Sequence, residues 1–176
     1  VMFIEGASMK VISLFSGAGG LDLGLIEAGN AVVWANDIDA DACATYRRNI
    51  GNHIVCADIK DIDIESLPDD ADVVVGGFPC QGFSQANLLR KVEDDRNLLY
   101  KFFYQAIKEK QPKFFIAENV RGILSIGGGT VIKQITADFE GAGYITTVNL
   151  VNMADYGVPQ TRQRVIIIGQ RKDIGM

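Results

Sequence analysis

Apolar runs of strand length alternate with segments of helical period along nearly the whole chain. Strands are predicted at residues 11–15, 31–36, 53–56, 72–76, 114–118, 144–151 and 164–170. Helices are predicted at residues 21–28, 39–49, 98–110 and 130–140. Strands that are apolar throughout and separated by helices indicate a mostly parallel sheet covered on both faces, a doubly wound α/β fold. Ligands bind such folds at the carboxyl ends of the strands.

The length of 176 residues fits one domain. Residues 1–8 precede a second methionine and the first strand, so we interpret them as an expression remnant and assign the domain to residues 9–176. No apolar run approaches the roughly 20 residues that span a bilayer, and no signal peptide is visible. We therefore expect a cytoplasmic protein with no membrane partner.

Composition argues against several kinds of site. The three cysteines, Cys43, Cys56 and Cys80, contain no C-x-x-C pair, which disfavours both a disulfide framework and a zinc site. His53 is the only histidine, and no nucleophile motif lies beside it, which disfavours a hydrolase. The net charge of −5 is unusual for a free-standing DNA-binding domain, because such domains present basic surfaces to phosphates.

A glycine-rich turn at residues 15–20 follows the first strand and opens a helix, as in nucleotide-binding folds. Asp37 ends the second strand 20 positions after Gly17, a spacing that suits a carboxylate bound to ribose hydroxyls. The dinucleotide fingerprint would need glycine where Asp22 stands, and a carboxylate there would repel a pyrophosphate. A nucleoside without phosphates, such as S-adenosylmethionine, fits better. Asp58, at the end of the third strand, is a candidate acceptor for an adenine amine.

Three further groups of residues follow later strands. Cys80 lies on a loop bounded by proline and glycine after the fourth strand, unlike a cysteine buried in a core. Glu118 ends the fifth strand, where partial desolvation suits a proton donor. Arg162 and Arg164 are two positions apart, so one face of an extended segment carries both guanidinium groups, which can hold an anion or position a carboxylate.

The order of these motifs resembles the C5-cytosine DNA methyltransferase family from residue 10 to about residue 170. Phe15–Gly20 is similar to the family's donor-binding motif, Pro79-Cys80-Gln81 to its nucleophile motif and Glu118-Asn119-Val120 to the motif of its catalytic glutamate. Asp155–Arg164 is similar to the late motif with paired arginines. The resemblance implies transfer of a methyl group from S-adenosylmethionine to C5 of cytosine in double-stranded DNA, with S-adenosylhomocysteine as product and no metal.

The resemblance also implies residue roles. The Cys80 thiolate would attack C6 of a cytosine flipped out of the duplex, while Glu118 would hydrogen-bond to N3. Arg164 and Arg162 would orient the base, and the loop at residues 81–96 would close over DNA. Residues implied to surround the donor are Phe15, Gly17, Gly19, Asp37, Ile38, Asp58, Ile59, Pro79 and Leu99.

Two positions depart from the family pattern. Ile38 stands where an aromatic side chain often stacks on adenine, and Asn97 replaces a frequent glycine. The family also continues past the paired arginines into a target-recognition region and two final motifs. We therefore expect this chain to be a fragment or one subunit of a split prokaryotic or phage restriction-modification enzyme, poorly active alone. Loss of that region would also explain the acidic charge.

Three alternatives stay open. A nicotinamide oxidoreductase would explain the glycine turn and Asp37 but gives Cys80 no role. An inactive binding or regulatory module conflicts with the presence of Cys80, Glu118 and both arginines. A tRNA cytosine methyltransferase of the same family is the closest rival, although Gly82-Phe83-Ser84 after the nucleophile motif favours the DNA enzymes.

Overall fold

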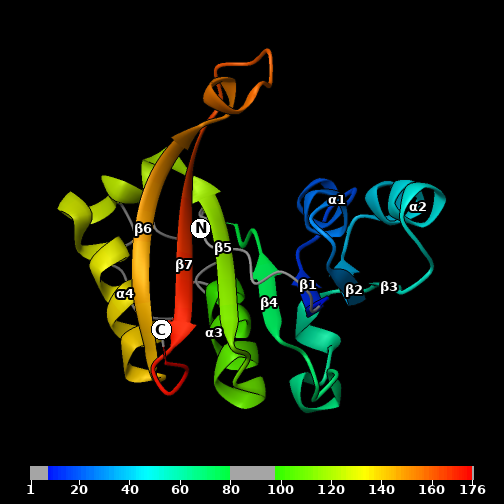
Figure 1. The fold of residues 1–176 in the computed structure, drawn as a ribbon, viewed down its shortest axis with the longest axis horizontal. Coiled ribbons are helices and arrows are strands. Elements are labelled where there is room, and N and C mark those ends of the chain that lie inside the picture. Colours follow the sequence, from blue (N-terminus) through cyan, green and yellow to red (C-terminus); the bar gives the residue numbers. More distant parts are fainter. Residues whose placement is uncertain (1–7, 80–97, 176) are drawn as a thin grey trace.

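The computed structural model describes residues 8–79 and 98–175. Their strands form one seven-stranded sheet (Figure 1). The strand order is β3-β2-β1-β4-β5-β7-β6, and only β7 runs opposite to its neighbours. The strands are β1 (Lys10–Leu14), β2 (Ala31–Asp37), β3 (Ile54–Cys56), β4 (Val73–Gly76), β5 (Phe114–Val120), β6 (Tyr144–Asn152) and β7 (Gln163–Arg171). The mostly parallel sheet predicted from the apolar runs is thereby confirmed.

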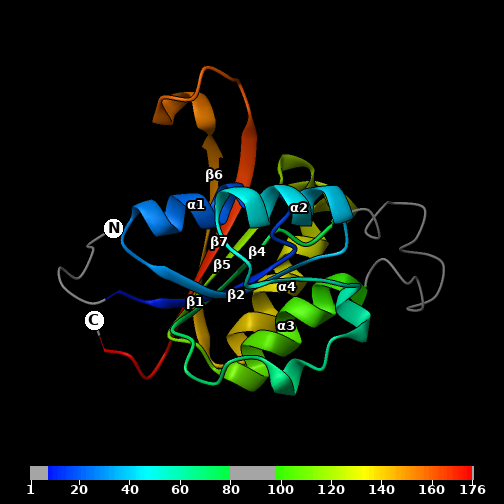
Figure 2. The ribbon, with the colours of Figure 1, turned by 90° about the vertical axis from the view of Figure 1, so that its right-hand side faces the viewer.

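Helices cover both faces of the sheet. Figure 2 shows α1 (Gly20–Glu27) and α2 (Ala40–Asn49) on one side, and α3 (Leu98–Lys110) and α4 (Thr130–Gly141) on the other. This is the doubly wound arrangement. Element ends differ from the predicted ones by at most two residues; β2 runs one residue further, to Asp37, and β5 runs two residues further, to Val120. None of the described helices is long and apolar enough to cross a membrane.

Strand β7 contains a glycine, Gly169, where it packs on the core side of β5. Phe115 faces α3 and α4, and its ring lies 4.3 Å from that of Phe139. Gly169 is the partner of Phe115 in the antiparallel register, and a Cβ at Gly169 would lie 1.9 Å from the Phe115 ring. The glycine therefore leaves the space that the phenylalanine fills.

The opposite face of β5, β7 and β6 is more open. Ile166 and Ile168 of β7 are half-buried there, and Ile145 of β6 is 57% exposed. No helix within the described ranges lies in front of these strands in Figure 1. Beyond the sheet, the connection between β6 and β7 projects as a hairpin with a 3₁₀ turn at Met153–Tyr156.

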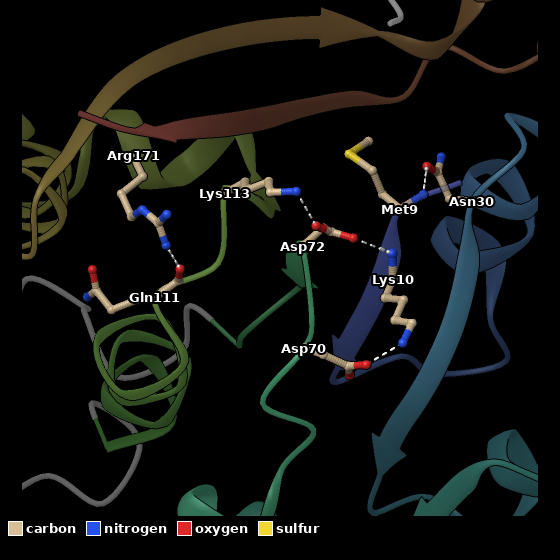
Figure 3. A network of polar contacts seen from close by, with 8 residues as sticks. All are labelled: Met9, Lys10, Asn30, Asp70, Asp72, Gln111, Lys113 and Arg171. Atoms are coloured by element: carbon tan, nitrogen blue, oxygen red, sulfur yellow. Dashed lines mark hydrogen bonds and ion pairs between the residues drawn. The ribbon is translucent and has the colours of Figure 1, made fainter. Parts of the chain in front are cut away.

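A polar network joins the amino ends of β1, β4 and β5 (Figure 3). Asp72 accepts a hydrogen bond of 3.0 Å from the Lys10 backbone N–H and pairs with Lys113 Nζ at 2.7 Å. Lys10 also pairs with Asp70, and Arg171 donates to the Gln111 carbonyl. The Lys113 ammonium and the Lys10 backbone N–H hold the pKa of Asp72 below its usual value. This edge lies away from the strand ends where ligands bind, so we assign the network to stability.

Asp72→Asn should reduce the free energy of unfolding at pH 7 by about 1 kcal/mol, because a charge-assisted pair becomes a neutral hydrogen bond. A carboxyl with a depressed folded-state pKa stabilises the fold above its unfolded-state pKa of about 3.9 and loses that contribution as pH falls through the folded-state pKa. The difference between wild type and Asp72→Asn should therefore vanish in strong acid. Urea unfolding from pH 2 to 7 measures it, with the exposed Asp155→Asn as control. A difference that is constant with pH would contradict the assignment.

Candidate functional site

The turn after β1 has the backbone geometry of a ligand cradle. Gly17 and Gly19 have φ values of +56° and +90°, and Phe15 has a φ of +55°, which is uncommon for a residue with a Cβ. Ser16 N–H donates to the Asn36 carbonyl at 2.9 Å, which joins the turn to the end of β2. A Cβ on Gly17 would meet no atom within 4 Å, so the space above the turn is open.

Asp37 lies against this turn, as its position in the sequence predicted. Its Oδ2 accepts a hydrogen bond of 2.7 Å from Gly17 N–H, and its Oδ1 accepts one of 2.9 Å from Asp39 N–H. The neighbouring Ile38 side chain is 66% exposed. Asp58 accepts from Lys60 N–H at the start of a short 3₁₀ turn, and Ile59 is buried in the core below it.

Two cavities open at this edge of the sheet and share a wall. The first, of about 210 Å³, is lined by Ser13, Leu14, Phe15, Ser16, Leu21, Asp22, Gly76, Gly77 and Glu118. The second, of about 480 Å³, is lined by Gly77, Phe78, Pro79, Glu118, Asn119, Val120, Gly122 and Ile126. Gly77 and Glu118 belong to both. A Cβ on Gly77 would lie 3.2 Å from Glu118 Oε2, so the absence of a side chain there leaves the glutamate its place between the cavities.

The sheet register brings Glu118 and Arg164 together. Arg164 Nε lies 2.7 Å from Glu118 Oε1, with 19% of the arginine side chain and 31% of the glutamate side chain exposed. The antiparallel pairing of β5 with β7 sets Arg164 opposite Val120, two positions along the strand from Glu118 and on the same face of the sheet. Arg162 lies outside β7 with its side chain exposed, and it makes no contact with Glu118 within the described residues. The structure therefore pairs one of the two predicted arginines with the glutamate.

Asn119 is a site residue to which the sequence motifs gave no role. It is 3% exposed, and its Nδ2 donates to the Phe78 carbonyl at 2.9 Å, while its Oδ1 accepts from Val120 N–H at 2.9 Å. Phe78 is itself buried against Phe103. The Asn119 side chain thus fixes the segment that leads to Pro79. Strand alternation from Phe115 and Ala117 already placed Asn119 on the buried face, which was the available signal.

Other predicted residues are placed as follows. Pro79 is exposed and lines the second cavity, and Leu99 is half-buried in α3 against the core. Cys80, the loop at residues 81–96 and Asn97 lie outside the described residues. No group of three or more His, Cys, Asp or Glu side chains that could hold a metal occurs in residues 8–79 and 98–175.

A family model for the C-5 cytosine-specific DNA methylases matches residues 9–176. The chain belongs to this family. The resemblance drawn from the motifs is thereby confirmed. The C-5 cytosine methylase chain is 48% identical to the Type II methyltransferase M.NgoFVII of Neisseria gonorrhoeae over 168 residues, which cover 94% of the chain and 45% of that relative. It is 45% identical to M.FnuDI of Fusobacterium nucleatum, covering 96% of the chain and 48% of the relative.

Solved structures agree with the fold of this methylase chain. A protein described as a prophage-encoded DNA modification methyltransferase (E. coli) superposes with a TM-score of 0.78 at 35% identity, covering 96% of the chain and 49% of that protein. The S. pombe Dnmt2 methyltransferase superposes with a TM-score of 0.76 at 20% identity, which supports the fold alone. The chain spans about half the length of the curated relatives that it matches.

Asn119→Leu should lower the free energy of unfolding of the methylase chain by about 2 kcal/mol, because the buried Phe78 carbonyl and Val120 N–H would both lose a partner. Urea unfolding followed by circular dichroism measures this loss. The same substitution at the exposed Asn149 of β6 is the control and should change stability by less than about 0.5 kcal/mol. Equal effects at the two positions would show that the Asn119 hydrogen bonds are not needed.

Proposed function

We propose that this chain is the donor-binding and catalytic part of a DNA (cytosine-5)-methyltransferase of a bacterial or phage restriction-modification system, acting in the cytoplasm. The observation that carries the proposal is the position of Glu118. It lies in the wall between a cavity at the glycine turn and a cavity at the segment leading to Cys80. A methyl donor in the first cavity and a cytosine in the second would meet at this residue.

We assign the first cavity, with the glycine turn beside it, to S-adenosylmethionine. Phe15 and Ser16 line the cavity, Gly17 beside them leaves open space for a ligand, and Gly19 lets the turn pack on the Tyr46 ring. Asp37 uses one lone pair of each carboxylate oxygen on backbone N–H groups, which leaves others for ribose hydroxyls. The exposed Ile38, together with Asp58, Ile59, Pro79 and Leu99, would complete the surroundings. When bound, S-adenosylmethionine supplies an electrophilic methyl group.

The second cavity suits a flipped cytosine. We propose that the Cys80 thiolate forms a bond to C6 and that Glu118, hydrogen-bonded at N3, donates the proton that balances the charge on the ring. The ion pair with Arg164 holds Glu118 in place. Arg162, which forms no ion pair with Glu118 within the described residues, would help to orient the base instead. After transfer, N3 returns its proton to Glu118, a base or water takes the C5 proton, and the Cys80–C6 bond breaks to release the Cys80 thiolate.

Double-stranded DNA is the proposed partner, and target recognition is assigned to further polypeptide, encoded in the same gene or supplied by a partner subunit. Two observations support this. The relatives are about twice as long as the region that matches, and the open face of β5, β7 and β6 presents the apolar side chains of Ile166, Ile168 and Ile145. We expect the chain alone to methylate DNA poorly.

A chimera of residues 9–176 with the second half of M.NgoFVII tests the chemistry, because the matching region of that relative is 48% identical. With S-adenosylmethionine and duplex DNA that carries 5-fluorocytosine at the target position, the chimera should form a covalent adduct visible by denaturing electrophoresis. Cys80→Ala should abolish the adduct, whereas the control Cys56→Ala should keep it. Glu118→Gln should slow methylation of ordinary DNA about 10²- to 10⁴-fold, the usual effect of losing a proton donor.

The same experiment separates the closest alternative. A tRNA with 5-fluorocytosine should not be trapped by the chimera under conditions that trap DNA. Trapping of tRNA in preference to DNA would favour a tRNA cytosine methyltransferase, and an adduct that persists in Cys80→Ala would refute the proposed nucleophile for either substrate.

A further inference from the structure

Helix α1 buries the side chain of Asp22, whereas three of its apolar side chains are exposed. Asp22 is 0% exposed, whereas Leu21, Leu23 and Ile26 are 37%, 47% and 37% exposed. A buried carboxylate is costly unless it is hydrogen-bonded. Asp22 lies in the first turn of α1, where the helix dipole favours negative charge, immediately after the glycine turn.

The partners of Asp22 are hydroxyl groups. Ser13 Oγ donates to Oδ1 at 2.6 Å, and the Tyr46 hydroxyl donates to Oδ2 at 2.7 Å. Both oxygens accept, which is the arrangement of an ionised carboxylate. Burial raises the pKa of Asp22 above its usual value, against the smaller opposing effects of the bonds from Ser13 and Tyr46 and of the nearby His53. No lysine or arginine within the described ranges pairs with Asp22.

The tyrosine extends this chain of contacts to His53. Burial, followed by the adjoining Asp22, raises the pKa of Tyr46, which keeps its hydroxyl protonated and able to donate. The Tyr46 hydroxyl lies 3.0 Å from His53 Nε2. Since its one proton is directed at Asp22, the hydrogen in this second bond comes from the histidine. Asp22 therefore accepts hydrogen bonds from Ser13 of β1 and Tyr46 of α2, and His53 donates in turn to the Tyr46 hydroxyl.

The same tyrosine supports the donor cradle. A Cβ on Gly19 would lie 2.8 Å from the Tyr46 ring, so the ring packs directly against the glycine turn. Ser13 and Asp22 also line the first cavity, together with Phe15 and Ser16. The buried negative charge thus lies at the inner wall of the cavity that we assign to the donor, in a region of low dielectric constant where charge acts strongly.

We propose that Asp22, held by Ser13 and Tyr46, is a specificity-determining charge of the donor site that favours the cationic sulfonium of S-adenosylmethionine over the neutral thioether of S-adenosylhomocysteine. The inference rests on the proposed function, because it takes the first cavity as the donor site. It gives the site a way to release product after transfer, since the ligand loses its positive charge when the methyl group leaves while the protein charge stays.

Binding of the two ligands to the chain, measured by isothermal titration calorimetry, tests the charge directly. Asp22→Asn keeps the size of the side chain and removes its charge. The affinity for S-adenosylmethionine should fall on the order of tenfold, as expected for loss of one unit charge at an effective dielectric constant of about 20, and more than the affinity for S-adenosylhomocysteine. Glu27→Gln is the matched control: it removes an exposed charge of the same helix that does not line the cavity, so the ratio of the two affinities should be unchanged.

If Asp22→Asn does not fold, Asp22→Leu combined with Tyr46→Phe replaces the polar pair by apolar groups, an exchange that buried pairs often tolerate. The affinity ratio should fall in that variant as well. A wild-type ratio retained in either charge-free variant would overturn the inference and leave the proposed function intact. Failure of the wild-type chain to bind either ligand would instead remove the donor site, and with it both proposals.

Discussion

The parallel pairing of β4 with β5 sets Gly76 beside Ala117, and the next residues along the two strands are Gly77 and Glu118. Neither glycine could carry a side chain without conflict, since a Cβ on Gly76 would lie 2.6 Å from the Leu14 carbonyl and one on Gly77 would press on Glu118. Gly76 therefore lets β4 lie close to the backbone of β1, and Gly77 leaves room for the Glu118 side chain in the wall that the two cavities share. The rest of the site is arranged around this close approach.

Strand β7, which runs antiparallel to both of its neighbours, adds a cationic residue to the site formed by the parallel strands. A parallel neighbour in this position would present only its carboxyl end at the site, whereas β7 enters from the hairpin and brings its first residues there. Arg164, one residue into that strand, reaches Glu118 because of this direction. One strand of opposite direction thus supplies the cation for a carboxylate held by a parallel strand, and it carries the chain back to the core at Ile167.

Much of this could be predicted from sequence because the determining signals are local. Continuous apolar runs gave the strands, and residues at their ends, such as Asp37 and Glu118, were predicted to share one edge of the sheet. The inward turn of Asp22 could not be predicted, since it depends on hydroxyl donors nine and 24 positions away in the chain. The role of Asn119 depends likewise on a contact across 41 positions with Phe78. Long-range partners of single polar side chains leave no periodic trace in a sequence.

Three carboxylates surround the glycine turn, and each is balanced in a different way. Asp37 accepts from two backbone N–H groups, Glu118 is paired with Arg164, and Asp22 has only hydroxyl donors. Of the three, Asp22 and Glu118 line the first cavity, and Arg164 balances Glu118, so the remaining negative charge of Asp22 disfavours phosphate there and favours a cationic ligand. The sequence had suggested a ligand without phosphates from Asp22 alone. The structure adds that this carboxylate lies in the wall of the first cavity, where its side-chain donors are the hydroxyl groups of Ser13 and Tyr46.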